Sequence, residues 1–472
     1  MKKNLIILLI LCYSISSFAT GESVIIKGNI KGIRGFVYAK KPVKVLIIED
    51  LITNTKKVIK SGFTDEFGNY ELSVPIMKTQ FAFIQFKKVE RTLYIAPGKS
   101  YFINVVAPIQ DLENSHGFFA KDVRKAKIKN KYPGEINYLI DSIENMSSRF
   151  LFNSAGGRRN YKVVKKFTDS LKIQFQSVKN SYFQRYVTYK TAELEMFVLR
   201  QFRKEFARRY FDNSKSLIEH IQCMHVFNAF FKGHMKNGIQ TQDKAPFHSY
   251  ILRGDLERML TEVYKTTNYN RELNELILLK GLFEISNSYF YRKSRINVTL
   301  DKIISATNYP HHIIIANNIK KHLNHLASGY PAPPITLNYE GVDFNLKNYR
   351  GKYVYLCFFK TWNTSFEKEI EVINYLKKRY KEELEVVCIA TDIERKSYNH
   401  FLAKQLNKEY FYYYNHNPKL LSDYRIKDFR VQKSSISSER YFLIGPKGNV
   451  IIGEAKSPTQ RFEYDLRKII LK

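Results

Sequence analysis

YVYLCFFKTWNTSFEKE, residues 353–369, decides the fold of the carboxyl-terminal part of the chain. Its first half, Tyr353–Phe359, is an unbroken apolar run rich in aromatic residues, which predicts a strand buried on both faces. Its second half leads into residues 365–380, where apolar residues such as Ile373 and Leu376 recur at helical spacing. A buried strand followed directly by an amphipathic helix is typical of a sheet with helices packed on it.

Strand and helix patterns alternate on both sides of this stretch. The proline-rich segment YPAPPITL at 330–337 predicts an extended entry into a new domain. The further expected elements are strands at 342–346 and 384–390, a helix at 397–406, an extended segment at 410–414, a short helix at 420–424, a hairpin at 441–452 and a last helix at 461–471. We therefore expect an α/β domain at 331–472, whose mixed sheet is covered on both faces.

Three segments of this domain resemble a known family. They are APPITL at the entry, YRGKYVYLCFFKTW around the first buried strand, and YFLIGPKGNVI at the hairpin. In this order they resemble the TlpA/ResA and AhpC/TSA (redoxin) group of thioredoxin-like proteins. The resemblance implies a thioredoxin-like fold and, for most such proteins, exported thiol–disulfide oxidoreductases that carry a W-C-x-x-C-x-x-E motif after that strand.

The chain departs from this family where the chemistry takes place. Asn363 and Phe366 stand at the two cysteine positions, and Glu439 stands near the position of the family's cis-proline. An amide and a phenyl ring cannot attack a disulfide. Asn363 is instead a good N-cap for the helix that begins near Thr364.

We accordingly expect a non-catalytic module that binds a protein or peptide of the cell envelope. The predicted binding groove is the surface that relatives use for substrates, and its expected lining is Trp362, Thr364, Phe366, Glu439 and Arg440. An enzyme is disfavoured, and the sequence predicts no cofactor and no catalytic residue.

An alternative keeps the chemistry and moves it to another thiol. The chain without its amino-terminal leader has Cys223, Cys357 and Cys388, and one of them would serve a thiol–disulfide oxidoreductase or a peroxidase-like enzyme. Cys357 and Cys388 lie in strands that we expect to be buried, where thiols resist ionisation. Fast labelling of one thiol in the folded protein would favour this alternative.

The amino terminus predicts export. Lys2 and Lys3 precede the apolar run Leu5–Leu11, and small residues end at Ala19, which is the layout of a signal peptide at 1–19. A lipoprotein anchored through Cys12 is disfavoured, because bulky Leu11 precedes it. We expect a mature chain without a transmembrane span, in the periplasm or cell envelope of a Gram-negative bacterium.

Residues 22–110 have short β-type runs separated by turns such as Asp65–Asn69 and Pro97–Gly98. This spacing predicts a small antiparallel β-sandwich. The segments FTDEFGNYELSV and LYIAPGKSYFINV resemble hairpins of carboxypeptidase-regulatory-like sandwiches and of a DUF4369-like domain found in secreted Bacteroidetes thioredoxin-like proteins.

Residues 121–328 change to helical periodicity, and they predict an irregular α-helical region. The whole chain is then a multidomain α+β protein. Of its net charge of +33, this region carries the largest share, since it has 36 basic and 18 acidic residues between 121 and 330. A solvated lysine-rich surface accounts for this charge, and weak binding to anionic lipids or glycans is a further alternative. Export argues against nucleic acid as a partner.

The same region has the one histidine group near a cysteine, formed by His220, Cys223, His225 and His234. On a helix, His220 and Cys223 share a face, whereas His225 points elsewhere. A tetrahedral zinc site needs four converging ligands in paired spacings. We therefore predict no metal site.

Overall fold

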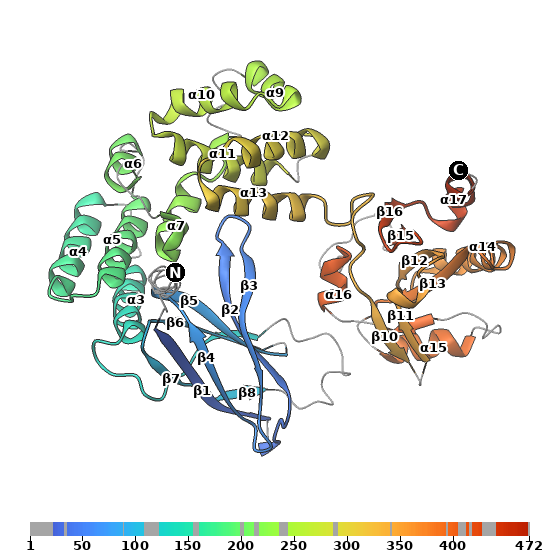
Figure 1. Ribbon diagram of the computed structural model, residues 1–472, viewed down its shortest axis with the longest axis horizontal. Helices are drawn as coiled ribbons and strands as arrows, with labels where there is room; N and C mark the ends of the chain where they lie inside the picture. The colour runs from blue at the N-terminus through green and yellow to red at the C-terminus, as the bar shows by residue number, and fades with distance from the viewer. Residues whose placement is uncertain are drawn as a thin grey trace, which may run out of the picture. The chain divides into compact units, whose positions relative to one another are not determined.

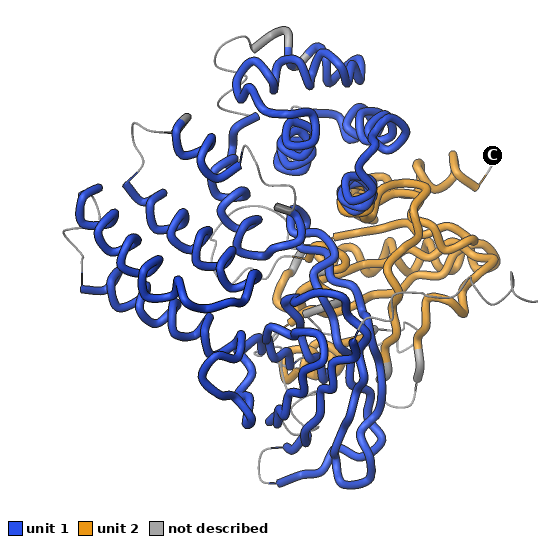
Figure 2. The backbone as a smooth tube through the Cα atoms, turned by 60° about the vertical axis from the view of Figure 1, so that its left-hand side comes forward, with its two compact units in different colours: residues 1–109, 121–320 blue, residues 110–120, 321–472 orange. Residues whose placement is uncertain are grey.

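The computed structural model describes most of the chain in two compact units (Figures 1 and 2). Among the described residues, the first unit ends at Lys320 and the second begins at Lys321. The described ranges are 22–32, 35–87, 89–107, 122–153, 160–198, 203–211, 217–235, 244–286, 291–339, 342–392, 395–404, 412–414, 418–426 and 440–470. The predicted signal peptide, Cys12 and Glu439 lie outside them.

The first unit begins with a β region. Its strands are β1 (Ser23–Gly32), β2 (Pro42–Asp50), β3 (Thr55–Phe63), β4 (Asn69–Pro75), β5 (Gln80–Phe86), β6 (Val89–Ile95), β7 (Ser100–Phe102), β8 (Val105–Ala107) and β9 (Asp122–Lys125). One sheet has the order β4-β1-β7, with β8 also paired to β1, and the other has the order β3-β2-β5-β6-β9. Residues from both sheets form one apolar cluster, because side chains alternate between buried and exposed along strands such as β4.

The two sheets differ from the predicted antiparallel arrangement. Strand β1 runs parallel to β7 and β8, and β6 runs parallel to β9. Both sheets are therefore mixed. Strand β9 also lies within the region predicted to be helical, and it pairs with β6 over Val89–Thr92. The correction arises because strand partners depend on contacts that a single sequence pattern does not encode.

The rest of the first unit is helical. Its helices are α3 (Ile136–Asn153), α4 (Tyr161–Phe175), α5 (Ser181–Met196), α6 (Arg203–Phe211), the 3₁₀ turn η3 (Leu217–Glu219), α7 (Ile221–Phe230), α9 (Lys244–Arg253), α10 (Leu256–Thr267), α11 (Arg271–Ile285), α12 (Lys293–Ala306) and α13 (Pro310–Leu323). Asn160, Asn180, Asp255 and Asn270 each cap a helix with a side-chain oxygen that accepts a backbone N–H. Helix α11 is buried along most of its length, so neighbouring segments cover most of its surface.

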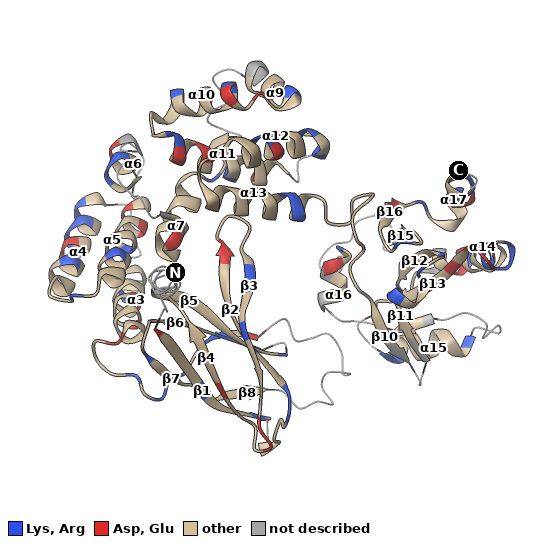
Figure 3. Ribbon diagram, in the orientation of Figure 1, with Lys and Arg blue, Asp and Glu red and all other residues tan. Residues whose placement is uncertain are grey.

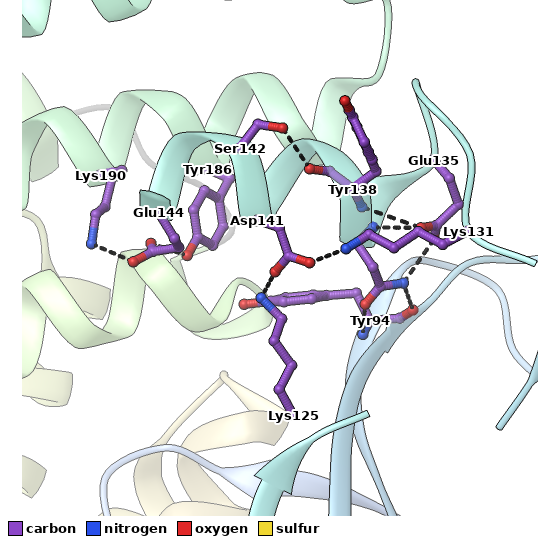
Figure 4. A network of polar contacts seen from close by, with 11 residues as sticks. Tyr94, Lys125, Lys131, Glu135, Tyr138, Asp141, Ser142, Glu144, Tyr186 and Lys190 are labelled. Atoms are coloured by element: carbon purple, nitrogen blue, oxygen red, sulfur yellow. Dashed lines mark hydrogen bonds and ion pairs between the residues drawn. The ribbon is translucent and has the colours of Figure 1, made fainter. Parts of the chain in front are cut away.

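A buried asparagine joins the larger sheet to α3. The Asn137 side chain is 2% exposed; its Oδ1 accepts the Tyr94 N–H at 2.8 Å, and its Nδ2 donates to the Tyr94 carbonyl at 2.8 Å. Since β9 pairs with β6 only as far as Thr92, the amide completes the edge of β6 in place of a neighbouring strand. The Tyr94 ring meets the ring of Tyr186 in α5 edge-on, and the Tyr186 hydroxyl donates to Glu144 at 2.6 Å (Figure 4).

The β2–β3 hairpin makes a second connection to the helices. Leu51 and Ile52 at its tip are buried, and the Asn228 side chain of α7 donates to the Leu51 carbonyl at 2.8 Å. Asp50 is 1% exposed and accepts the Ile52 N–H at 2.7 Å. The sequence treats residues 22–110 and 121–328 as separate domains, whereas the structure has them in one compact unit.

The second unit is an α/β domain. Its elements are β10 (Thr336–Tyr339), β11 (Val342–Asn345), η5 (Leu346–Tyr349), β12 (Tyr353–Phe359), α14 (Thr364–Arg379), β13 (Leu384–Ala390), α15 (Arg395–Lys404), β14 (Tyr412–Tyr414), α16 (Pro418–Asp423), β15 (Arg440–Ile444), β16 (Val450–Ala455), η6 (Pro458–Gln460) and α17 (Phe462–Ile470). The main sheet has the order β14-β13-β12-β15-β16. The parallel strands β12, β13 and β14 and the antiparallel β15 confirm the predicted mixed sheet.

Both faces of this sheet are covered by apolar packing. Leu356 and Phe358 of β12 belong to one cluster, and Tyr355, Cys357 and Phe359 belong to the cluster on the opposite face. Helices α14, α15 and α17 contribute to the second cluster, and α16 contributes to the first. The sequence expectation of a buried β12 is therefore confirmed, since six of its seven residues are buried. No helix among the described residues has the length and apolarity that a membrane span needs.

Candidate functional site

The candidate site is the connection between β12 and α14. Phe359 ends the strand, and Lys360–Asn363 form a turn in which the Asn363 N–H donates to the Lys360 carbonyl at 3.1 Å. Asn363 stands directly before the helix, and its carbonyl accepts the Phe366 N–H at 3.2 Å. Trp362 projects from this turn with 65% of its surface exposed. The amino terminus of α14 thus presents an indole and an amide where the family has its first thiol.

Phe366 belongs to the core and not to a surface groove. Its side chain is 1% exposed, and its ring stacks on Phe359 with the centroids 3.9 Å apart. Phe401 of α15 lies on the same apolar cluster. The expectation that Phe366 lines the binding groove was therefore wrong, because the first turn of α14 points this position towards the sheet.

Glu369 has a structural partner set that the sequence did not predict. It is 6% exposed; its Oε2 accepts the hydroxyl of Tyr441 in β15, and its Oε1 accepts the Thr459 hydroxyl of η6 at 3.4 Å. A carboxylate in the first turns of a helix is usually explained by the helix dipole. Here the side chain also fastens α14 to β15 and η6. Glu369 stands at the glutamate position of the W-C-x-x-C-x-x-E pattern, and this position was the sequence feature that could have indicated its role.

Buried polar groups join the loops after β12 and β13. Lys360 is 6% exposed and its ammonium group donates to the Thr391 carbonyl. Asp392 is 3% exposed and accepts both the Thr361 N–H, at 3.1 Å, and the Thr361 hydroxyl, at 2.9 Å. These contacts hold the Trp362 turn against the neighbouring strand end. Sequence reasoning missed them because the two loops are separated by a whole helix and strand.

Arg440 is the other predicted groove residue whose side chain the structure describes, and it is engaged by neighbouring groups. Arg440 begins β15 opposite Phe358; its guanidinium donates to the Arg425 carbonyl at 3.0 Å and to Glu454 at 2.6 Å. Glu439 and the side chain of Thr364 lie outside the described residues. Of the five predicted lining residues, Trp362 is therefore the one that the structure shows to be largely exposed.

The thiols lie far from solvent. Cys223, Cys357 and Cys388 are all free and buried. Cys357 and Cys388 are paired in register across the parallel strands β12 and β13. Burial, followed by the hydrogen bond with the Cys388 thiol, raises the pKa of Cys357 well above its ordinary value, and burial raises the pKa of Cys223. Neutral, inaccessible thiols are poor nucleophiles.

The histidine and cysteine group of the first unit does not converge on a metal site. The His220 Nε2 lies 3.1 Å from the Tyr182 carbonyl, and the imidazole stacks on the Tyr182 ring at 4.1 Å. His234 Nε2 instead lies 3.2 Å from the Thr266 hydroxyl. Among the residues that the structure describes, no three histidine, cysteine, aspartate or glutamate side chains are placed to hold a metal ion.

Comparison with known families agrees with this geometry for the second unit. Residues 328–452 match the model of the AhpC/TSA family, so this part of the chain is an AhpC/TSA thioredoxin-like domain. No curated protein matched the chain. The family match covers a minority of the chain, and it leaves the first 327 residues unassigned.

Solved structures give similarities of low score. A thiol-disulfide oxidoreductase from Bacteroides vulgatus is 22% identical, with a TM-score of 0.27, over 31% of this chain and 97% of its own. A thiol:disulfide interchange protein DsbE from Chlorobium tepidum is 21% identical, with a TM-score of 0.26, over 30% of this chain and 96% of its own. A thioredoxin-like protein from Bacteroides caccae is 16% identical, with a TM-score of 0.28, over 56% of this chain and 92% of its own.

Proposed function

We propose that this chain is an exported thioredoxin-like protein that has lost thiol–disulfide chemistry and binds a protein or peptide of the cell envelope at the β12–α14 turn. The observation that carries the proposal is the replacement of both motif thiols by Asn363 and a buried Phe366, while Cys223, Cys357 and Cys388 are buried elsewhere. Without an accessible thiolate, the site has no nucleophile for a disulfide.

Trp362 is the proposed anchor of this binding surface. Tryptophan is over-represented among residues that dominate binding energy, because it brings a large apolar area with few rotatable bonds. The chain has one tryptophan, and it is 65% exposed on a turn whose backbone is held by Asp392. A rigid turn lowers the entropy lost on binding. Arg440 and Glu454 form an ion pair at the same end of the sheet.

The location and subfamily are part of the same proposal. The basic start, the apolar run Leu5–Leu11 and the small residues up to Ala19 support cleavage of a signal peptide and residence in the periplasm or envelope. The segments quoted above support a TlpA/ResA-type carboxyl-terminal domain and a DUF4369-like sandwich at 22–110. Loss of the leader on export would be visible as an amino terminus near residue 20.

Two measurements test the binding proposal. The first is turnover of insulin disulfides by the purified protein, for which we expect no rate above the uncatalysed reaction. The second places a photo-crosslinking amino acid at Trp362 in cells, with Tyr464 as the matched control because it is 57% exposed on α17 of the same unit. A discrete adduct from position 362 alone supports the proposal. Disulfide turnover by the unaltered protein, or equal adducts from both positions, would contradict it.

A second candidate function concerns the basic surface of the helical region. Lysine and arginine residues are spread along its helices (Figure 3). On α4, Lys162, Lys165 and Lys166 line a shallow depression together with Ile173, which is 65% exposed, and with Asp169, which pairs with Lys165. Such a face would attract anionic glycans or lipid headgroups. Lys162→Gln with Lys166→Gln should then weaken binding to heparin-type polyanions, and salt-insensitive binding would exclude this candidate.

A further inference from the structure

The first turn of α13 carries two neighbouring histidines that face two carboxylates of α11. The His312 Nδ1 lies 2.8 Å from the Glu275 Oε1, and the His311 Nε2 lies 3.4 Å from the Glu272 Oε1. We call these four residues the histidine latch. Because both contacts run between the same two helices, they fasten the beginning of α13 to the first turns of α11.

The pair of His312 and Glu275 lies inside the first unit. The two side chains are 0% and 1% exposed, and the ring of Tyr309 meets the His312 ring edge-on with centroids 5.0 Å apart. Arg271 attracts the Glu275 carboxylate, although its own ion pair is with Glu257 of α10. With the carboxylate as the acceptor, the His312 Nδ1 carries the proton of the hydrogen bond. The His312 Nε2 has no hydrogen-bond partner among the described residues, so a proton added there would be buried without an acceptor.

His311 lies directly beside this buried pair. Its ring is edge-on to the His312 ring, with the centroids 4.4 Å apart. Burial, followed by the neighbouring His312, lowers the pKa of His311 from 6.5 to about 4, although the carboxylates of Glu275 and of Glu219 in η3 act in the opposite direction. A solvated histidine titrates at about pH 6.5. A falling pH therefore charges His311 in an open latch before it charges His311 in a closed one.

The charged groups around His311 attract its imidazolium only weakly. Glu272 lies nearest, but its side chain is 35% exposed, so water screens the attraction. Glu219 forms an ion pair with Lys78, which precedes β5. Burial raises the pKa of Tyr309, so its hydroxyl stays neutral in acid. The burial of His311 therefore outweighs the charges that face it.

Helix α13 joins the two units along the chain. Among the described residues, the first unit ends at Lys320 and the second begins at Lys321, so the chain passes from one to the other within this helix. The middle of α13 is held differently from its start, because Ile315, Ala316 and Ile319 are buried apolar residues. Apolar contacts do not depend on protonation. Acid therefore acts on the first turn of α13 and leaves the rest of the helix packed.

We propose that the histidine latch is an acid-opened switch, in which proton uptake by His311 releases the first turn of α13 from α11. The direction follows from proton linkage: the open latch binds a proton more readily than the closed latch, so a falling pH shifts the equilibrium towards the open form. Histidine suits this role because its charge changes between about pH 5 and pH 8. Opening leaves the segment that leads into the second unit held by fewer contacts.

Amide hydrogen exchange, measured by mass spectrometry at pH 7.5 and pH 5.5, tests the proposal with the predicted mature chain, residues 20–472, which keeps every described residue. The informative amides are those of residues 314–316, because in a helix they bond to the carbonyls of the first turn. After correction for the intrinsic pH dependence of exchange, their opening should increase about threefold to tenfold at pH 5.5. The lower figure allows for solvent screening, because the His311 side chain is 34% exposed. The amides of α4, in the same unit, should change little.

Three variants assign the acid response to a residue. His311→Gln keeps a polar side chain and removes the titrating ring, so the opening of residues 314–316 should be equal at the two pH values. His400→Gln is the matched control, since His400 is exposed on α15 of the second unit, and it should keep the acid response. His220→Gln removes the other buried histidine whose pKa is lowered to about 4, and the response of α13 should persist there as well.

Three results would overturn the proposal. The first is equal exchange of residues 314–316 at both pH values in the unaltered chain. The second is an equal acceleration of α13 and α4 in acid, because the first unit would then loosen as a whole. The third is an acid response that persists in His311→Gln or disappears in His220→Gln, since the proton would then be taken up at another group.

Discussion

The two units use buried polar groups at different places. In the second unit, Lys360 and Asp392 lie at the ends of strands, beside the turn where the family carries its thiols. In the first unit, Asn137 bonds to the Tyr94 backbone of β6, and His220 packs near Tyr186 of α5. Glu144 accepts the Tyr186 hydroxyl between α3 and α5 (Figure 4). Both groups make hydrogen bonds to neighbouring loops, strands and helices.

This difference shows how a chemical site becomes a structural one. At the β12–α14 turn, Phe359 stacks on Phe366, and the polar side chains of Lys360 and Asp392 hydrogen-bond to the neighbouring loops. Their partners hold the turn and present Trp362. The first unit has buried tyrosine, histidine and cysteine side chains, yet these also serve packing. A polar residue at a family's reactive position therefore indicates chemistry only when its neighbours support that chemistry.

The largest expected effect is a loss of stability of the second unit. Phe366→Ala should lower the free energy of unfolding by about 4 kcal/mol, because it leaves a cavity under Phe359. Denaturant unfolding followed by the fluorescence of Trp362, the single tryptophan, measures this effect. Trp362 itself cannot be substituted as a control, because Trp362→Tyr would remove the fluorescence that is measured. Tyr464→Ala is the control, and its free energy of unfolding should change by less than about 0.5 kcal/mol. Truncation of a packed core ring costs several kcal/mol, so a decrease below about 1 kcal/mol in the free energy of unfolding of Phe366→Ala would show that this ring is not packed as described.

The next largest effect is the dependence of the first unit's stability on pH. Burial lowers the pKa of His220 from 6.5 to about 4, so the unfolded chain takes up a proton before the folded chain does. The first unit should therefore lose stability as the pH falls from 6.5 towards 4, by up to about 3 kcal/mol from this residue.

Urea unfolding of the first unit at pH 7 and pH 4, followed by circular dichroism, measures this loss. In His220→Gln, the amide can still donate to the Tyr182 carbonyl, and this component of the acid sensitivity should disappear. An unchanged pH dependence in the variant would assign the acid sensitivity to other groups, such as His225, whose pKa is also lowered by burial.

A smaller loss of stability is expected at the contact between β6 and α3 in the first unit. Asn137→Ala removes the group that pairs with both the N–H and the carbonyl of Tyr94, and it should cost about 2 kcal/mol. Hydrogen exchange of β6 should accelerate as well. Ser142→Ala removes an exposed hydrogen bond to the Tyr138 carbonyl and should change little. Equal effects of the two substitutions would contradict the structural role of Asn137.

The smallest effect is an expected absence of reaction. Cys223, Cys357 and Cys388 should react with a thiol reagent only when the protein unfolds, because all three are buried. Mass spectrometry after labelling of residues 20–472, with and without denaturant, identifies each thiol. Rapid labelling of one of them in the folded protein would revive the alternative of an enzyme with a relocated thiol.

Local sequence patterns predicted the second unit well. The apolar runs at 353–359 and 384–390 became the buried strands β12 and β13, and the predicted helix at 365–380 is α14 within one residue at either end. Continuous apolar strands and helical periodicity are properties of neighbouring residues, so they are visible without tertiary contacts. The same rule failed for the strand directions of the first unit, because pairing joins distant segments.

The sequence by itself established that the β12–α14 turn has no thiol, that a buried strand precedes it, and that the chain is strongly basic. Only the tertiary structure decided that Phe366 is core, that Asp392 and Lys360 hold the turn, and that Phe63 and Phe67 stand in solvent. The physical reason is that residue type limits the chemistry available at a position, whereas burial and partners depend on packing between segments far apart in the chain.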